Sequence, residues 1–188
     1  MSSLGNLTVL TGPSGVGKGT IVRKILDHHS DVWLSISATT RQPRSGEIHG
    51  QHYLFLEEKD FKKIINKNGF LEWASFSNNF YGTPKETVIQ KIKEGTMVLL
   101  EIELEGARQI RKSFPGALQI FLAPPDLAEL EKRIRERGTE SEEAIRARLE
   151  IAKRELIAVK EFDALVINKN IDTAFREIES LMGLNKKY

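Results

Sequence analysis

The chain has 188 residues, of which 40% are hydrophobic, and this suffices for a single folded domain with a real core. Its 28 basic and 26 acidic residues leave a net charge of +2, so we expect no binding of duplex nucleic acid. It has no cysteine, which excludes disulfides and thiolate chemistry, and no apolar stretch long enough to span a membrane, so we expect a cytoplasmic protein.

A glycine-rich segment follows the first apolar run, at residues 7–10, and precedes a run with helical spacing at 21–28. It consists of Gly12, Pro13, Ser14, Gly15, Val16, Gly17, Lys18, Gly19 and Thr20. Glycines let backbone N–H groups approach phosphate oxygens, while the next helix N-terminus and a lysine add positive charge. An ordinary glycine-rich turn is the alternative. We predict a phosphate-binding loop for a nucleoside triphosphate, in the variant of nucleoside monophosphate kinases, because Gly19 replaces the usual Ser or Thr.

Short apolar runs alternate with amphipathic runs along much of the chain, which is typical of an α/β fold. We expect a parallel sheet whose strands lie at residues 7–10, 33–37, 97–102, 118–122 and 164–167. The helices expected to flank it lie at residues 21–28, 105–113 and 173–182. We therefore expect one domain, 1–188, with a core made of residues 1–37, 86–124 and 162–188.

Residues 38–85 interrupt this alternation with a turn-rich arm, alternating apolar residues at 51–56 and aromatic strands around 70–81. They predict a small mixed α+β lobe that reaches over the nucleotide site. Its end has the pattern of a helix start, with Thr83 as N-cap, Pro84 at the first helical position and a glutamate three residues after the cap. We expect that helix to continue to residue 95.

Residues 125–161 form the second interruption, and their apolar spacing predicts a helical hairpin. Gly138 breaks the first helix, and Thr139 and Glu142 are expected to form a capping pair for a second helix from about residue 141 to 161. Arginines gather near the bend, which favours a lid over the nucleotide. The alternative is a solvated hairpin whose arginines only pair with neighbouring glutamates.

The chain resembles the guanylate kinase family over nearly its whole length. The resemblance is carried by SISATTRQPRSGE at 35–47, GQHYLF at 50–55, FLEWA at 70–74, YGT at 81–83, LEIE at 100–103, RGTE at 137–140 and RL at 148–149. It implies ATP-dependent transfer of a phosphoryl group to GMP or dGMP, with Mg²⁺. The implied fold is a P-loop kinase core with a parallel sheet, a GMP-binding lobe at 38–85 and a helical lid at 125–161.

The resemblance also assigns residues to the acceptor. The GMP phosphate is expected to meet Arg41, Arg44, Tyr53 and Tyr81, where each guanidinium can offer a fork of two donors. The guanine is expected to meet Ser37, Glu72, Thr83 and Glu103. A carboxylate accepts from both the N1–H and the N2 amine of guanine, whereas adenine offers neither, so a buried acceptor left unpaired disfavours adenine. Glu103 stands where the resemblance leads us to expect aspartate.

Donor and catalytic residues follow in the same way. The expected catalytic residues are Lys18, Arg41, Arg133, Arg137 and Arg148, the last three acting like arginine fingers. Thr20 and Glu101 are expected to bind Mg²⁺, Glu101 through water. Asn168 is expected to face the donor adenine, although a turn cap explains it almost as well.

Two other functions remain open from the sequence. A kinase of another phosphorylated acceptor, such as a ribose bisphosphate, would keep Lys18 and the phosphate-binding arginines without guanine-binding residues. A non-catalytic guanylate-kinase-like binding domain would typically have a damaged phosphate loop, whereas Gly12, Gly17 and Lys18 are all present here. The aromatic residues at 53 and 81 could also be core residues of the small lobe. Oligomeric state is open, with a homodimer as one alternative.

Overall fold

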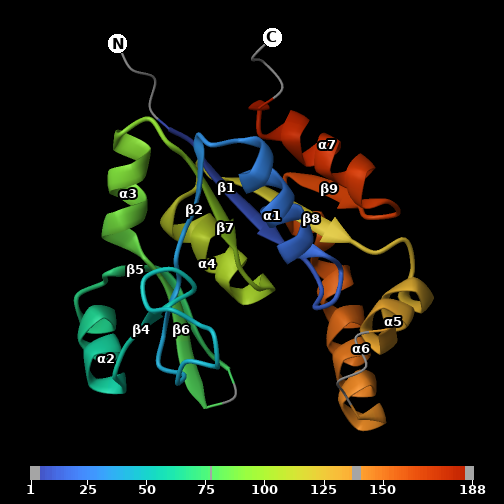
Figure 1. Ribbon diagram of the computed structural model, residues 1–188, viewed down its shortest axis with the longest axis horizontal. Helices are drawn as coiled ribbons and strands as arrows, with labels where there is room; N and C mark the ends of the chain where they lie inside the picture. The colour runs from blue at the N-terminus through green and yellow to red at the C-terminus, as the bar shows by residue number, and fades with distance from the viewer. Residues whose placement is uncertain (1–4, 77, 137–140, 185–188) are drawn as a thin grey trace.

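A five-stranded parallel sheet forms the centre of the molecule (Figure 1). The computed structural model describes residues 5–76, 78–136 and 141–184. The strands, in their order across the sheet, are β2 (Val32–Leu34), β7 (Met97–Glu101), β1 (Leu7–Thr11), β8 (Leu118–Ala123) and β9 (Ala164–Ile167). The expected α/β class with a parallel sheet is confirmed.

Helices cover both faces of this sheet, because the strand residues alternate between two apolar clusters. One cluster joins Leu10, Leu99 and Ile120 to helices α1 (Lys18–His28) and α7 (Ile171–Leu181). The other joins the neighbouring positions Val9, Val98 and Leu100 to α3 (Lys85–Lys93) and α4 (Leu104–Ser113). A continuous apolar run such as residues 98–100 is therefore buried on both sides, as a central strand of a covered sheet must be.

A second, smaller sheet has the strand order β4-β3-β6-β5. Its strands are β3 (Ala38–Thr39), β4 (Leu54–Phe55), β5 (Phe70–Phe76) and β6 (Asn79–Pro84), and helix α2 (Glu58–Asn66) packs beside them. Phe61 of α2 stacks on Phe70 with ring centroids 4.4 Å apart, so the sheet has its own apolar centre. The β3–β4 pair is parallel, whereas β3–β6 and β5–β6 are antiparallel.

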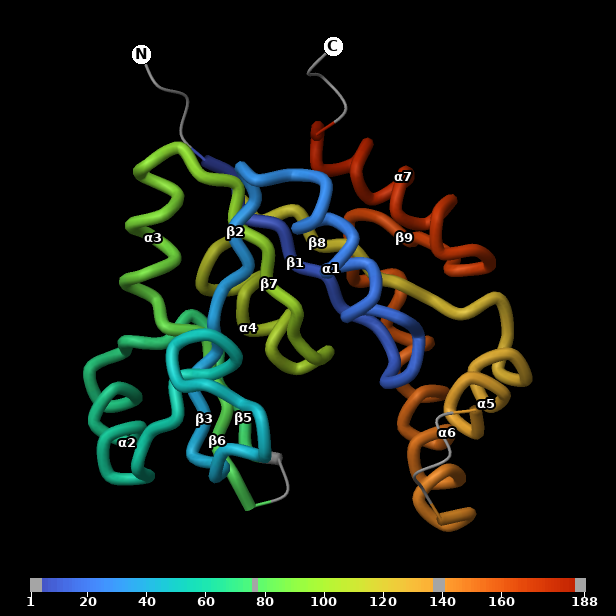
Figure 2. The backbone as a smooth tube through the Cα atoms, viewed as in Figure 1, coloured from blue at the N-terminus to red at the C-terminus, as the bar shows by residue number. Residues whose placement is uncertain are grey.

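A helical hairpin is formed by α5 (Leu127–Glu136) and α6 (Glu142–Ile157), which continues into a short 3-10 helix, η1 (Ala158–Glu161). Leu130, Ile134 and Ile145 belong to the same apolar cluster as α1, so the hairpin is attached to the core through its own buried face. Figure 2 shows the hairpin and the small sheet extending from the same end of the main sheet, on opposite sides.

Three local predictions were wrong. The strand expected at 33–37 ends at Leu34, and the chain then turns toward the small sheet. Thr83 is not the cap of α3, because it lies in β6 and its hydroxyl is bonded elsewhere, so α3 begins after Pro84. The cap of α6 is Ser141, whose Oγ accepts from the backbone N–H of Ala144 at 3.3 Å. Thr139, the expected cap, lies outside the described residues.

Candidate active site

The glycine-rich loop connects β1 to α1 at the carboxyl edge of the parallel strands, where ligands bind in open α/β sheets. Gly12 and Gly17 have φ of 146° and 104°, which L side chains rarely adopt. A Cβ on Gly12 would lie 2.1 Å from the carbonyl oxygen of Leu122. The loop can therefore keep this close path only with glycine, and its backbone stays open to a ligand.

Lys18 is the first residue of α1, and its side chain folds back over the loop. Its Nζ donates to the carbonyl oxygen of Gly12 at 2.5 Å and lies 3.6 Å from a carboxylate oxygen of Glu103. Only 7% of Lys18 is exposed. A positive charge is thus held at the mouth of the loop, next to the helix N-terminus. The lysine and the helix N-terminus together favour the binding of an anionic group there.

Of the predicted lid arginines, Arg148 contacts the loop directly, and Arg133 is linked to it through Asn168. Arg148 Nη1 is 3.0 Å from the Ser14 hydroxyl, and Arg133 Nη2 donates to the carbonyl oxygen of Asn168 at 2.9 Å. The Asn168 amide in turn donates to the carbonyl oxygen of Val16 at 2.8 Å. The hairpin is therefore more than a solvated surface element, although Arg133 also pairs with its neighbour Glu129. Arg137 lies outside the described residues.

Glu101 ends β7 beside the loop. A Cβ on Gly19 would lie 3.7 and 3.9 Å from its two carboxylate oxygens, so the missing side chain leaves room in front of the carboxylate. Burial raises the pKa of Glu101 and the negative charge of Glu103 adds to this, while Lys18 opposes them. Thr20 is exposed one residue further along. One carboxylate and one hydroxyl suit Mg²⁺, which keeps most of its water and phosphate ligands. Among the described residues, no cluster of three or more carboxylate or imidazole groups could hold a metal by itself.

Glu155, on α6, is a further carboxylate near this centre, and the sequence analysis did not single it out. Its pKa is raised to about 7, mainly by burial and also by the charge of Glu103, while Lys18 acts in the opposite direction. A glutamate in the middle of a charge-dense helix carries no motif that would distinguish it from its neighbours. Only the packing of α6 against the core reveals its position.

Arg41, on the arm at residues 41–47, lies close to Tyr53, which directly precedes β4. The Arg41 guanidinium carbon lies 5.4 Å from the centre of the Tyr53 ring, and the Tyr53 and Tyr81 rings are 6.3 Å apart. Arg41 also donates to both carboxylate oxygens of Glu47, at 2.9 and 2.8 Å. Glu47 was quoted within a motif but given no role in the sequence analysis. Three of the four predicted phosphate-binding side chains are thus brought together.

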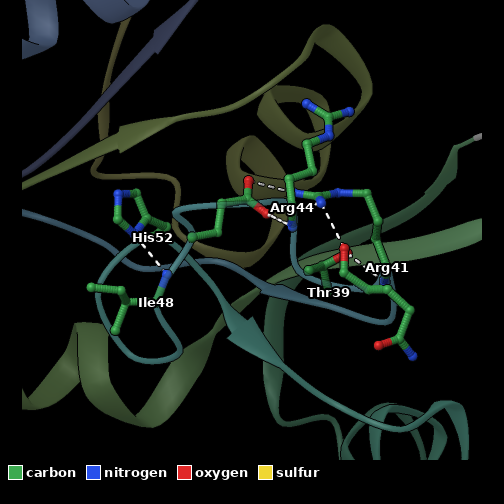
Figure 3. A network of polar contacts seen from close by, with 7 residues as sticks. Thr39, Arg41, Arg44, Ile48 and His52 are labelled. Carbon is green, nitrogen blue, oxygen red and sulfur yellow. Dashed lines mark hydrogen bonds and ion pairs between the residues drawn. The ribbon is translucent and has the colours of Figure 1, made fainter.

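Glu47 also organises the turn that carries Arg44, since its carboxylate accepts from the backbone N–H of Arg44 at 2.7 Å. The hydrogen bonds from Arg41 and Arg44 lower the pKa of Glu47 to about 2. Two neighbouring contacts complete the arm in Figure 3: the Arg41 N–H donates to the Thr39 hydroxyl at 3.1 Å, and the Ile48 N–H donates to a His52 ring nitrogen. The arm is therefore held in one shape with Arg41 pointing at the tyrosines.

Glu72 and Thr83 face each other across the antiparallel β5–β6 pair. The Thr83 hydroxyl donates to Glu72 Oε1 at 2.6 Å, and only 7% of Glu72 is exposed. Burial raises the pKa of Glu72, and the hydrogen bonds from Thr83 lower it. Ser37 lies half-buried just before β3. Glu103, by contrast, is directed at Lys18, so among the four predicted guanine-binding residues it is the one drawn to the phosphate loop.

Comparisons with known proteins point to the same family over nearly the whole chain. A sequence model described as guanylate kinase matches residues 5–184. The chain is 79% identical over 184 residues to the guanylate kinase of Prochlorococcus marinus strain NATL2A, covering 98% of this chain and 99% of the relative. It is 56% identical to that of Synechococcus elongatus, covering 95% and 97%. The crystal structure of guanylate kinase from Anaplasma phagocytophilum is similar, with a TM-score of 0.78, 26% identity, and 100% and 89% coverage.

Proposed function

The chain belongs to the guanylate kinase family, and from this premise we infer how its own residues carry out the reaction. It is a nucleoside monophosphate kinase that transfers the terminal phosphoryl group of ATP to GMP and so yields ADP and GDP. We extend this to dGMP, because none of the residues assigned to guanine or to the phosphate depends on a sugar hydroxyl. The small sheet with α2 is the proposed acceptor lobe, and the α5–α6 hairpin is the proposed lid.

The observation that best supports the acceptor is the buried carboxylate of Glu72. One of its oxygens is held by Thr83, so the side chain has a set orientation before any ligand binds. Guanine presents its N1–H and its N2 amine to such a carboxylate as two adjacent donors, whereas adenine has an unprotonated N1 and no amine at C2. Adenine would leave a buried acceptor unpaired, which costs about 1–3 kcal/mol. Ser37 and Glu103 are the further proposed contacts to the base.

Arg41, Arg44, Tyr53 and Tyr81 are proposed to hold the acceptor phosphate. The Arg41 fork and the two tyrosine rings already lie together, which supports a phosphate placed between them. Because both terminal nitrogens of Arg41 donate to Glu47, a phosphate either replaces Glu47 at one of these nitrogens or binds the N–H groups of the guanidinium that point away from Glu47. The tyrosines donate without adding charge.

In the proposed reaction an oxygen of the GMP phosphate attacks the terminal phosphorus of ATP, and the bond to the oxygen bridging to the next phosphate breaks. The residues at 12–20 cradle the donor phosphates, and Lys18 holds their negative charge. Arg133, Arg137 and Arg148 reach the transferring group from the lid and exclude water that would hydrolyse ATP. Mg²⁺, held by Thr20 and by Glu101 through water, would neutralise charge between two donor phosphates.

A kinase of a ribose bisphosphate would need the phosphate loop and the arginines but would gain nothing from a buried carboxylate fixed by a threonine. A non-catalytic binding domain would gain nothing from a lysine kept at the mouth of the loop with Arg148 beside it.

The proposed location is the cytoplasm, where ATP and GMP are made and used. A homodimer stays an alternative to a monomer. Within the described part of the chain, no helix is long and apolar enough to cross a membrane.

Release of ADP, measured in a coupled assay with GMP, dGMP, AMP, UMP and a ribose bisphosphate as acceptors, tests this function. We expect turnover with GMP and dGMP and at most a few per cent of that rate with the others. A chain that binds both ATP and GMP without consuming ATP would favour the binding domain instead. Turnover with the sugar phosphate alone would favour the other kinase. Omission of Mg²⁺ in the presence of a chelator should abolish the rate.

A further inference from the structure

Strand β5 is bound to helix α4 on both sides of Glu72. The Ser113 hydroxyl donates to the carbonyl oxygen of Leu71 at 2.8 Å. The Gln109 side chain accepts from the Trp73 N–H at 3.1 Å and donates to the Trp73 carbonyl oxygen at 2.8 Å. The backbone of residues 71–73 is therefore held close to the helix and cannot move away from it without breaking three hydrogen bonds.

Gly106 lies on the same face of α4, three residues before Gln109 and seven before Ser113. A Cβ at this position would be 2.8 Å from Glu72 Oε2 and 3.2 Å from its carboxyl carbon. The first distance is shorter than real contacts of a Cβ, and the second is tighter than most of them. The carboxylate is also fixed from its other side, because Oε1 accepts from Thr83 at 2.6 Å. Glu72 therefore fills a space that exists only because position 106 has no side chain.

We propose that Gly106 is a specificity-determining position, which acts by leaving the space that orients the Glu72 carboxylate toward the base. This rests on the proposed function, since it takes Glu72 to be the acceptor for guanine. Oε2 does not take part in the bond from the Thr83 hydroxyl, so we take it to be the acceptor for the second N–H donor of the base. A methyl group at position 106 must displace this oxygen. The strand and the side chain of Glu72 cannot move away from α4 as a unit, because the hydrogen bonds of β5 to α4 and the bond from Thr83 hold them in place.

The test is Gly106→Ala, assayed with GMP and with IMP as acceptors at saturating ATP. IMP has the same N1–H but no N2 amine, so the ratio of kcat/KM between them measures the second acceptor contact. We expect this ratio to fall roughly tenfold to a hundredfold. The KM for ATP should not change. An unchanged GMP to IMP ratio would overturn the proposal.

Gly116→Ala is the matched control, because nothing lies within 4 Å of a Cβ there, and it should leave the ratio unchanged. Alanine in place of glycine favours a helix, so Gly106→Ala should still fold. The double variant Glu72→Asp with Gly106→Ala withdraws the carboxylate by one methylene and should restore part of the ratio relative to Gly106→Ala alone. If Gly106→Ala does not fold, the double variant should fold, and failure of both would overturn the proposal.

Glu72→Gln separates this proposal from the function on which it rests. If the unaltered protein does not phosphorylate GMP, the proposed function fails. If it does, and Glu72→Gln lowers the GMP to IMP ratio while Gly106→Ala does not, only the role of Gly106 fails. Adding Gly106→Ala to Glu72→Gln should cause no further fall in the ratio, because the oxygen it displaces is already lost as an acceptor.

Discussion

Arg41 and Glu47 form a bidentate pair in which both terminal nitrogens of the guanidinium donate to the two carboxylate oxygens, at 2.9 and 2.8 Å. The proposed phosphate-binding arginine is thus already engaged before the acceptor binds. Glu47 also accepts from the backbone of Arg44, so the same carboxylate shapes the turn that carries both arginines. The pair therefore holds Arg41 in place at the proposed phosphate site, and a phosphate that binds there must compete with Glu47.

Glu47→Gln tests which of these effects is larger. The substitution keeps the shape of the side chain and removes its charge, so it weakens the charge-assisted bonds that hold Arg41 and the turn. We expect the KM for GMP to rise about tenfold, corresponding to about 1.4 kcal/mol, with the KM for ATP unchanged. Steady-state kinetics with each substrate varied in turn would measure this. A lower KM for GMP would mean instead that Glu47 mainly competes with the phosphate.

Arg148→Ala should lower kcat by roughly a thousandfold, because this arginine lies at Ser14 of the phosphate loop and is proposed to meet the transferring group. The thermal midpoint should change by no more than about 2 °C, since a partly exposed contact contributes little to stability. Arg146→Ala, two residues away on the same helix and exposed, is the control and should keep kcat within about twofold. A normal kcat for Arg148→Ala would remove it from the reaction.

Asn168→Ala distinguishes support of the phosphate loop from contact with the donor base. The Asn168 amide donates to the carbonyl oxygen of Val16, so its loss should disturb the loop for any nucleoside triphosphate. We expect kcat/KM to fall by about tenfold for ATP and by the same factor for GTP as donor. A selective loss for ATP, measured as a change in the ATP to GTP ratio, would show that Asn168 reads the adenine.

The pKa of Glu155 predicts a pH dependence of stability. This carboxyl keeps its proton up to a pH of about 7 in the folded protein but loses it near 4.5 when unfolded. Between these values the folded state binds more protons, so the stability contributed by this group falls as pH rises. Glu155→Gln should remove this loss, which amounts to about 1 kcal/mol after allowance for the partial exposure of the side chain.

Thermal midpoints measured from pH 5 to pH 8 would check this prediction. The difference between Glu155→Gln and the unaltered protein should be small at pH 5 and should grow in favour of the variant up to about pH 7.5. Glu177→Gln, at an exposed position on α7, provides the control and should show a difference that does not change with pH. A constant difference for Glu155→Gln as well would place the Glu155 carboxyl in water.

The features that the sequence predicted most reliably are those that depend on residues close together in the chain. The glycine-rich loop, Lys18 at the helix start and the apolar runs of the parallel sheet all depend on local backbone constraints and on periodicity, and the strands and helices lie where expected with small differences at their ends. Glu72 and Thr83 were both selected as base contacts, and the structure brings them together across a strand pair. The guanine contact itself stays a prediction.

Long-range competition explains what the sequence did not predict. Thr83 has the pattern of a helix cap, but a buried carboxylate eleven residues earlier takes its hydroxyl. Asn168 follows the last strand as a turn residue would, and its partner is 152 positions away in the phosphate loop. Glu155 and Gly106 belong to no motif, and their importance depends on what packs against them. No local pattern contains such information.

The attachment of β5 to α4 also constrains how the small sheet can move relative to the core. Because β5 is an edge strand of the small sheet and three hydrogen bonds join it to α4, a rotation of the small sheet that kept these bonds would have β5 as its axis. Residues near this axis would then move little, and the displacement would grow across the sheet from β6 to β3 and on to β4. Glu72, on β5, would stay almost still during such a rotation, whereas Arg41, which follows β3, would be displaced: the proposed base contact would keep its place and the proposed phosphate contact would move.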